Sequence, residues 1–125
     1  MPRLFVRECD VAEEPDLCGG ALDLINSAVS DSRLISLATI FIDQNHSSRA
    51  HYHKMMEEIY YFIEGRGHVI IDDQQFHVEP GSAVFIPVGA VHQVINRGSS
   101  RLKFISADSP SYNPDDIHFP TQRTE

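Results

Sequence analysis

The chain has 125 residues, of which 42% are hydrophobic and 22% charged, a balance typical of one folded domain rather than of a disordered segment. Its 18 acidic side chains outnumber its 10 basic ones, and the net charge of -8 argues against nucleic acid or an anionic membrane surface as a partner. No apolar run reaches the roughly 18 residues that a membrane-spanning helix needs.

In chain order, the first third of the sequence carries weak structural signals. Leu4 to Val6 is a candidate short strand, and the acidic stretch 10–20, with its proline and glycines, is typical of a loop. Apolar residues at helical spacing within 21–29 favour a short helix, with an irregular segment as the alternative. Cys9 and Cys18 form no disulfide framework and lack metal spacing to a nearby histidine, so we interpret them as thiols without a chemical role, in a cytoplasmic protein.

From residue 35 onwards, short β-branched and apolar runs alternate with turns. No helix-length pattern interrupts them, which favours an all-β sandwich or barrel over a parallel α/β sheet. We therefore expect a single domain over residues 1–125, with an N-terminal arm at 1–31, a barrel at 32–108 and a proline-rich surface tail at 109–125. The expected strands are 35–42, 59–63, 68–71, 76–78, 83–86, 92–95 and 102–106.

Two histidines precede the strongest of these strands. Residues two apart point to the same face of a strand, so His51 and His53 are expected to point together into the barrel, where neutral imidazoles can bind a first-row metal ion. Glu58 has the wrong parity to join them on one unbroken strand. The segment 54–57 must therefore turn or bulge if the Glu58 carboxylate is to reach the same point.

Beyond that turn, the strand is apolar on both faces, as expected when one face lines a barrel interior and the other packs against a second sheet or subunit. The first face carries Glu58, Tyr60 and Phe62, and the second carries Ile59, Tyr61 and Ile63.

A third histidine follows a second ordered pattern of turn residues. Pro87 lacks an N–H and can end a strand, and Gly89 allows the positive φ of a tight turn. His92 then begins the next strand, facing inward together with Val94 and Asn96.

These two stretches resemble the two motifs of the cupin family. The first, Gly-x5-His-x-His-x3–4-Glu-x6-Gly, is matched at His51, His53, Glu58 and Gly65, with Asn45 in place of the opening glycine. Asn tolerates the left-handed conformation better than most residues, so this departure is expected to do little damage. The second, Gly-x5-Pro-x-Gly-x2-His-x3-Asn, is matched at Gly81, Pro87, Gly89, His92 and Asn96.

The resemblance implies a cupin jelly roll, or double-stranded β-helix, that holds one divalent metal ion through His51, His53, Glu58 and His92. Glu57 is the alternative carboxylate, but the spacing to Gly65 and the shared parity with Tyr60 favour Glu58. The mixed imidazole and carboxylate set suits Mn, Fe, Ni, Co or Zn. Single-domain chains of this kind are similar to the cupin half of mannose-6-phosphate isomerases.

Three uses of such a site remain open. The ion can act as a Lewis acid on a small carbonyl or hydroxy compound, as in isomerases, epimerases or decarboxylases. Alternatively, Fe(II) can support a dioxygenase, or the site can bind a small ligand without turnover. We rank Lewis-acid chemistry first.

The inner face offers few groups for proton transfer. Tyr60 is the candidate catalytic residue, with His46 or a metal-bound water as alternatives. The expected inner face is largely apolar and lacks Lys or Arg, so a phosphosugar substrate is not supported. Cupins commonly dimerise, and we expect a homodimer, to which residues 4–6 can supply a swapped or edge-pairing strand. The residues expected to line the inner face are Tyr60, Phe62, Phe85 and Val94.

Overall fold

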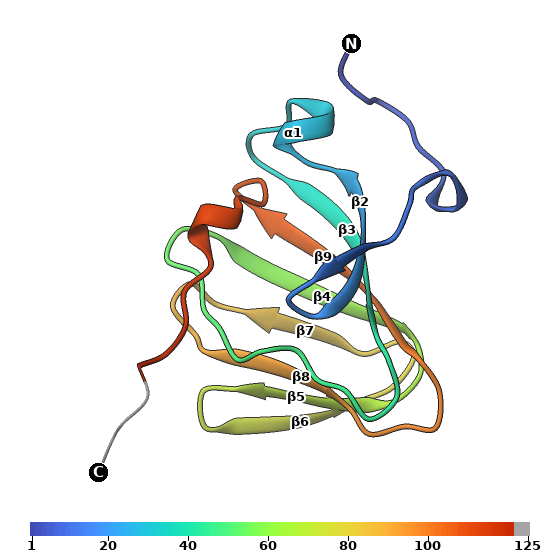
Figure 1. Ribbon diagram of the computed structural model, residues 1–125. Coiled ribbons are helices and arrows are strands. Elements are labelled where there is room, and N and C mark those ends of the chain that lie inside the picture. The colour runs from blue at the N-terminus through green and yellow to red at the C-terminus, as the bar shows by residue number, and fades with distance from the viewer. Residues whose placement is uncertain (122–125) are drawn as a thin grey trace.

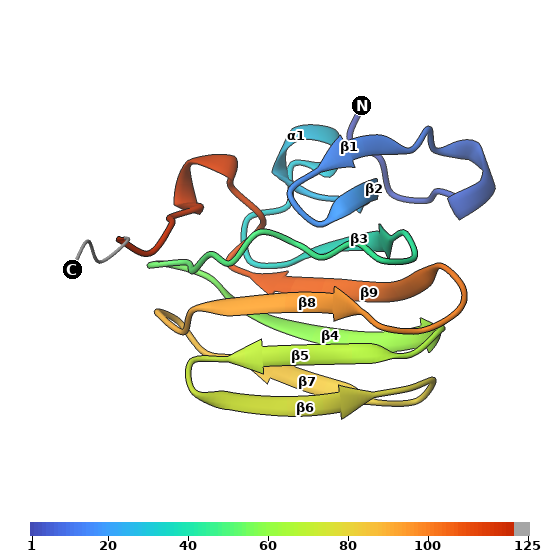
Figure 2. The same cartoon turned by 60° about the horizontal axis from the view of Figure 1, so that its bottom comes forward.

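Two antiparallel sheets form the protein, and a computed structural model describes them over residues 1–121. The larger sheet has six strands in the order β1-β2-β3-β9-β4-β7, and the smaller has three in the order β6-β5-β8 (Figure 1). In Figure 2 the smaller sheet lies in front of β9, β4 and β7 as a separate layer. The strands are β1 (Glu14–Asp16), β2 (Gly19–Ile25), β3 (Ser36–Ile42), β4 (Glu57–Glu64), β5 (Gly67–Ile71), β6 (Gln74–Val78), β7 (Ala83–Ile86), β8 (His92–Asn96) and β9 (Leu102–Ser109).

The predicted all-β architecture is confirmed, and each of the seven predicted runs forms a strand. The helical elements are short: α1 (Ser27–Ser30) and two 3-10 turns at Glu8–Asp10 and Pro114–Asp116. Within residues 1–121, no helix is long and apolar enough to cross a membrane. The last four residues of the predicted tail, 122–125, lie outside the described residues.

The predictions for the first third of the chain are wrong in three places. Residues 4–6 form no strand, and the predicted loop contains β1. The segment predicted as a helix or an irregular stretch is mostly β2, which pairs antiparallel with β3. Apolar residues three and four apart fit a helix, but they also fit a strand that is covered on both faces, and here sheet pairing decides the outcome.

The core lies between the sheets and is built by alternation along β4. Glu58, Tyr60 and Phe62 point inward and are buried, while Ile59 and Tyr61 on the other face are about half exposed. The Phe62 ring packs on the Phe104 ring with centroids 4.9 Å apart. This confirms the predicted division of the two faces of the strand.

Phe85 is the one residue of the predicted inner face that the structure places elsewhere. It pairs with Ile59 across the β4–β7 ladder and shares its outward face, where its side chain is 53% exposed. Residues directly opposite each other in an antiparallel pair point to the same face, so the position of Ile59 determines that of Phe85.

The segment between β3 and β4 runs along the edge strand β8. Asn45 turns the chain with a φ of 66°, the left-handed conformation expected from the motif glycine it replaces. Single bridges then connect Ser47 to Ile95 and His51 to His92. Bends at residues 54 and 55 interrupt the extended chain. This confirms the predicted turn or bulge within 54–57, which was inferred because Glu58 lies an odd number of residues after His53.

Candidate metal centre

Three buried histidines converge at one end of the barrel interior. His51 and His92 exchange two backbone hydrogen bonds of 3.1 and 2.9 Å, which places their side chains on the same face. His53 follows two residues after His51 and therefore shares its direction. One ring nitrogen from each of the three lies within 4.8 Å of the others.

The other ring nitrogen of each histidine is held by the backbone. His51 Nδ1 lies 2.7 Å from the Arg49 carbonyl, His53 Nδ1 lies 2.7 Å from the Asp116 carbonyl, and His92 Nδ1 lies 3.0 Å from the Ala90 carbonyl. A carbonyl oxygen can only accept, so each Nδ1 carries the proton. In the neutral imidazole this leaves Nε2 as a free acceptor, the form that binds metal ions.

Glu58 adds a buried carboxylate to this cluster. Its two oxygens lie 3.4 Å from His53 Nε2 and 3.2 Å from His92 Nε2. The Tyr60 hydroxyl donates a 2.8 Å hydrogen bond to the same carboxylate. Burial opposes ionisation of Glu58, but the close contacts with His53, His92 and Asp108 outweigh it and hold the pKa of this carboxyl well below its usual range.

Two of the imidazole nitrogens nevertheless lack a proper partner. His53 Nε2 and His92 Nε2 are buried and accept or donate no hydrogen bond, since their contacts with Glu58 have the distance but not the geometry of one. Burial, and then the charge of His92, lower the pKa of His51 to about 4, so His51 stays neutral at physiological pH. Unpartnered imidazole nitrogens beside an ionised carboxylate form a donor set that fits a divalent transition metal ion.

Asp108 belongs to the same cluster and was not predicted from the sequence. It lies opposite Glu58 in the β4–β9 ladder, and the Ser106 hydroxyl donates a 3.2 Å hydrogen bond to it. Burial, and then the charge of Glu58, raise the pKa of Asp108 to about 9. The alternation of Leu102, Phe104 and Ser106 continues to Asp108, which was the available signal, but the predicted strand ended at 106.

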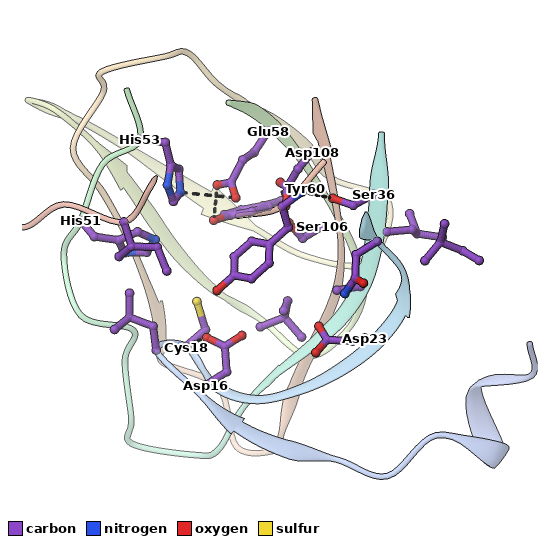
Figure 3. A pocket seen from close by; sticks show the side chains of 18 residues that line it. Asp16, Cys18, Asp23, Ser36, His51, His53, Glu58, Tyr60, Ser106 and Asp108 are labelled. Carbon is purple, nitrogen blue, oxygen red and sulfur yellow. Dashed lines mark hydrogen bonds and ion pairs between the residues drawn. The ribbon is translucent and has the colours of Figure 1, made fainter. Parts of the chain in front are cut away.

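A pocket opens from the cluster towards the N-terminal strands. Asp16 of β1 and Asp23 of β2 lie on the side of it away from Glu58 (Figure 3). Among the described residues that line the pocket, none is Lys or Arg, in agreement with the prediction for the inner face. Cys18 also lines it, and its burial raises the pKa of the thiol well above the usual value, which makes the thiol unreactive.

Two alternatives considered from the sequence lie away from this cluster. His46 is exposed, and its ring nitrogen Nδ1 lies 2.9 Å from the Gln44 carbonyl rather than in the pocket lining. Glu57 is exposed on the outward face of β4. The pocket residues of the N-terminal strands were missed because residues 10–25 were predicted to form a loop and a helix.

Residues 39–108 match the family model described as Cupin domain, and the chain belongs to the cupin family. An uncharacterised protein from Methanocaldococcus jannaschii is 35% identical over 81 residues, a match that covers 65% of this chain and 65% of that protein. A mannose-1-phosphate guanylyltransferase from Klebsiella pneumoniae is 33% identical over 72 residues, 57% of this chain but 15% of the transferase. The match thus spans less than two thirds of each relative.

Solved structures share the fold. The polyketide cyclase RemF from Streptomyces resistomycificus superimposes with a TM-score of 0.79 at 23% identity, over 98% of this chain and 87% of the cyclase. A predicted oxalate decarboxylase from Thermotoga maritima superimposes with a TM-score of 0.77 at 20% identity, over 86% of this chain and 99% of that chain. Both similarities confirm the cupin jelly roll.

Proposed function

We propose that this cupin is a metal-dependent enzyme in which His51, His53, Glu58 and His92 bind one divalent transition metal ion, such as Mn, Fe, Ni, Co or Zn. The observation that carries the proposal is the pair of buried Nε2 atoms without hydrogen-bond partners, on histidines whose Nδ1–H groups are already committed to backbone carbonyls. Burying such atoms is costly unless something binds them.

We propose isomerase, epimerase or decarboxylase chemistry on a small carbonyl or hydroxy compound. When bound, the ion supplies a Lewis acid that polarises such a group. Tyr60 remains the candidate for proton transfer, and its hydrogen bond to Glu58 also holds that carboxylate in place. The names of two structures that share the fold, a polyketide cyclase and a predicted oxalate decarboxylase, support the choice of an enzyme that acts on a small oxygenated molecule.

The charge of the pocket favours an uncharged substrate, and therefore isomerase or epimerase over decarboxylase chemistry, since a decarboxylase acts on an anionic carboxylate. Asp16 and Asp23 contribute carboxylates, and the described lining offers no basic side chain to bind a phosphate or carboxylate group. An anionic substrate would therefore meet repulsion from these two residues. Dihydroxyacetone and dihydroxyacetone phosphate form a matched pair of probes. We expect the metal-loaded protein to bind the neutral triose more tightly, and tighter binding of the phosphate would contradict this assignment.

Turnover under controlled oxygen tests the reaction class. We expect the protein loaded with Mn, Ni or Zn to convert a neutral hydroxyaldehyde or hydroxyketone equally well with and without oxygen. Oxygen consumption that follows the iron content would instead identify a dioxygenase. Tight, reversible binding without turnover across the panel would identify a binding protein.

We further propose that the protein forms a homodimer and acts in the cytoplasm. An apolar row on the outer face of the larger sheet supports the dimer: Phe85 pairs with Ile59, Ile59 with Ala107, and Ala107 with Leu37. All except Ala107 are exposed large hydrophobic residues. Contiguous exposed apolar surface of this kind commonly marks a subunit interface. The unpaired thiols of Cys9 and Cys18 are compatible with a reducing compartment.

A further inference from the structure

The chain after β9 returns to the candidate metal centre. Backbone hydrogen bonds of 2.9 and 3.0 Å join Tyr52 to His118, between His51 and His53. In Figure 1 the red C-terminal segment lies beside the green segment that leads into β4. The C-terminal segment therefore contacts the stretch that carries two of the proposed ligands.

Asp116 makes the most extensive of these contacts. Its carboxylate accepts three consecutive backbone N–H groups, from Lys54 at 2.8 Å, Met55 at 2.9 Å and Met56 at 3.0 Å. These three residues form the bend between His53 and Glu58. Burial opposes ionisation of Asp116, but the three N–H groups outweigh it and lower the pKa of the carboxyl.

The backbone of the same residue contacts His53. The Asp116 carbonyl accepts the Nδ1–H of His53 at 2.7 Å, the contact that leaves Nε2 facing the cluster. Asp116 thus contacts two parts of the site that position ligands. Its carboxylate binds the bend that brings Glu58 to the same side as the histidines, and its carbonyl orients the His53 ring.

We propose that Asp116 is a positioning residue of the metal centre, which fixes His53 through its carbonyl and Glu58 through the bend capped by its carboxylate. This inference rests on the proposed function, because it assumes that these residues bind a metal ion. Without the carboxylate, three N–H groups of the bend lose their acceptor, and the bend relaxes towards water-exposed conformations. Residues that orient metal ligands in this way typically change metal affinity roughly 10- to 100-fold when replaced.

The test compares zinc affinity in three variants, measured by competition with a chromophoric chelator well below the melting temperature. Asp116→Ala removes the acceptor, and Asp116→Asn replaces one acceptor oxygen with an N–H₂ that faces the backbone N–H groups. Asp115→Asn is the matched control, because it makes the same charge change on the neighbouring exposed side chain. We expect both Asp116 variants to lose roughly 10- to 100-fold in affinity, and Asp115→Asn to match the wild type.

A second readout follows His53 without any metal. At a pH where the ring is neutral, nitrogen-15 NMR of the metal-free wild type should show His53 as the Nδ1–H tautomer alone. Asp116→Ala should show a mixture of tautomers, because loss of the three carboxylate contacts lets residue 116, and with it the carbonyl that accepts from His53, move away. Wild-type affinity in both Asp116 variants, an equal loss in Asp115→Asn, or an unchanged His53 tautomer would each overturn the proposal. Failure of the wild type to bind zinc, or any other divalent ion, would instead refute the proposed function.

Discussion

The three clustered histidines are oriented by backbone carbonyls of different origin. His51 and His92 each contact the carbonyl two residues earlier in the chain, so local conformation alone orients their rings. His53 depends on Asp116, more than sixty residues away. At the residue scale, His53 is therefore the histidine most sensitive to changes elsewhere in the chain.

Asn45 is the one departure from the cupin motifs, and its backbone conformation gives a direct prediction. With φ at 66°, a β-branched residue there costs roughly 1–2 kcal/mol, while glycine adopts this conformation freely. We expect Asn45→Val to lower the free energy of unfolding by about this amount, measured by urea denaturation. Asn45→Gly is the control and should leave stability nearly unchanged; equal losses in both variants would point to the Asn side chain instead.

Tyr112, which lines the pocket, predicts how the stability of the fold depends on pH. Burial, and then the charges of Asp16 and Asp23, raise the pKa of Tyr112 to about 12 from the ordinary value of 10. The folded state then holds a proton that the unfolded state loses, so stability present below pH 10 falls as pH rises towards 12, by about 1.4 kcal/mol per pH unit. Tyr112→Phe should flatten this part of the stability profile, and a profile as steep as that of the wild type would contradict the raised pKa.

At the scale of elements, β4 joins the core to the candidate site on one face and meets solvent on the other. Phe62 is fully buried against Phe104, whereas its neighbour Ile63 is 38% exposed. We expect Phe62→Ala to cost about 3–5 kcal/mol in unfolding free energy, because it leaves a cavity in the core. Ile63→Ala should cost much less, and similar losses in the two variants would show that the assignment of faces is wrong.

The strand pattern was predictable where alternation and turns agreed. From β3 to β9, each predicted run overlaps an observed strand, and β7 matches at both ends. β1 was missed because it consists of a proline between two acidic residues, a sequence typical of a loop. β2 was missed because it is covered on both faces and so lacks the alternation of apolar and polar residues that marks a strand. Their strand conformation comes from pairing, of β2 with β3 and of β1 with β2, which a local pattern does not contain.

The candidate ligands were predictable from the sequence, but the residue that supports them, Asp116, was not. His51, His53 and His92 stand in fixed spacing with turn residues, and the parity of Glu58 revealed the bend at 54–57. Asp116 lay in a segment predicted to be a surface tail, and its role consists entirely of contacts between distant parts of the chain. Hydrogen bonds of this kind leave no periodic signal in a single sequence.

At the scale of the whole molecule, the proposed homodimer is tested through the outer face of the larger sheet. Ile59 lies in the middle of the apolar row, paired with Phe85 on one side and Ala107 on the other. A charged residue there would be buried without a partner in the dimer, so we expect Ile59→Lys to yield monomers in light scattering. Phe76→Lys is a matched control on the smaller sheet, where an exposed aromatic is replaced. A wild-type protein of monomeric mass would contradict the dimer.

Metal content tests the central claim most directly. The wild-type protein, purified without added metal and then reconstituted, should carry about one equivalent of a divalent transition metal ion per chain by mass spectrometry of the elements. Glu58→Gln should lower that content sharply, while Glu57→Gln on the exposed face should not. Less than about half an equivalent in the reconstituted wild type would contradict the account, because an intact four-ligand site should be largely filled by mass action.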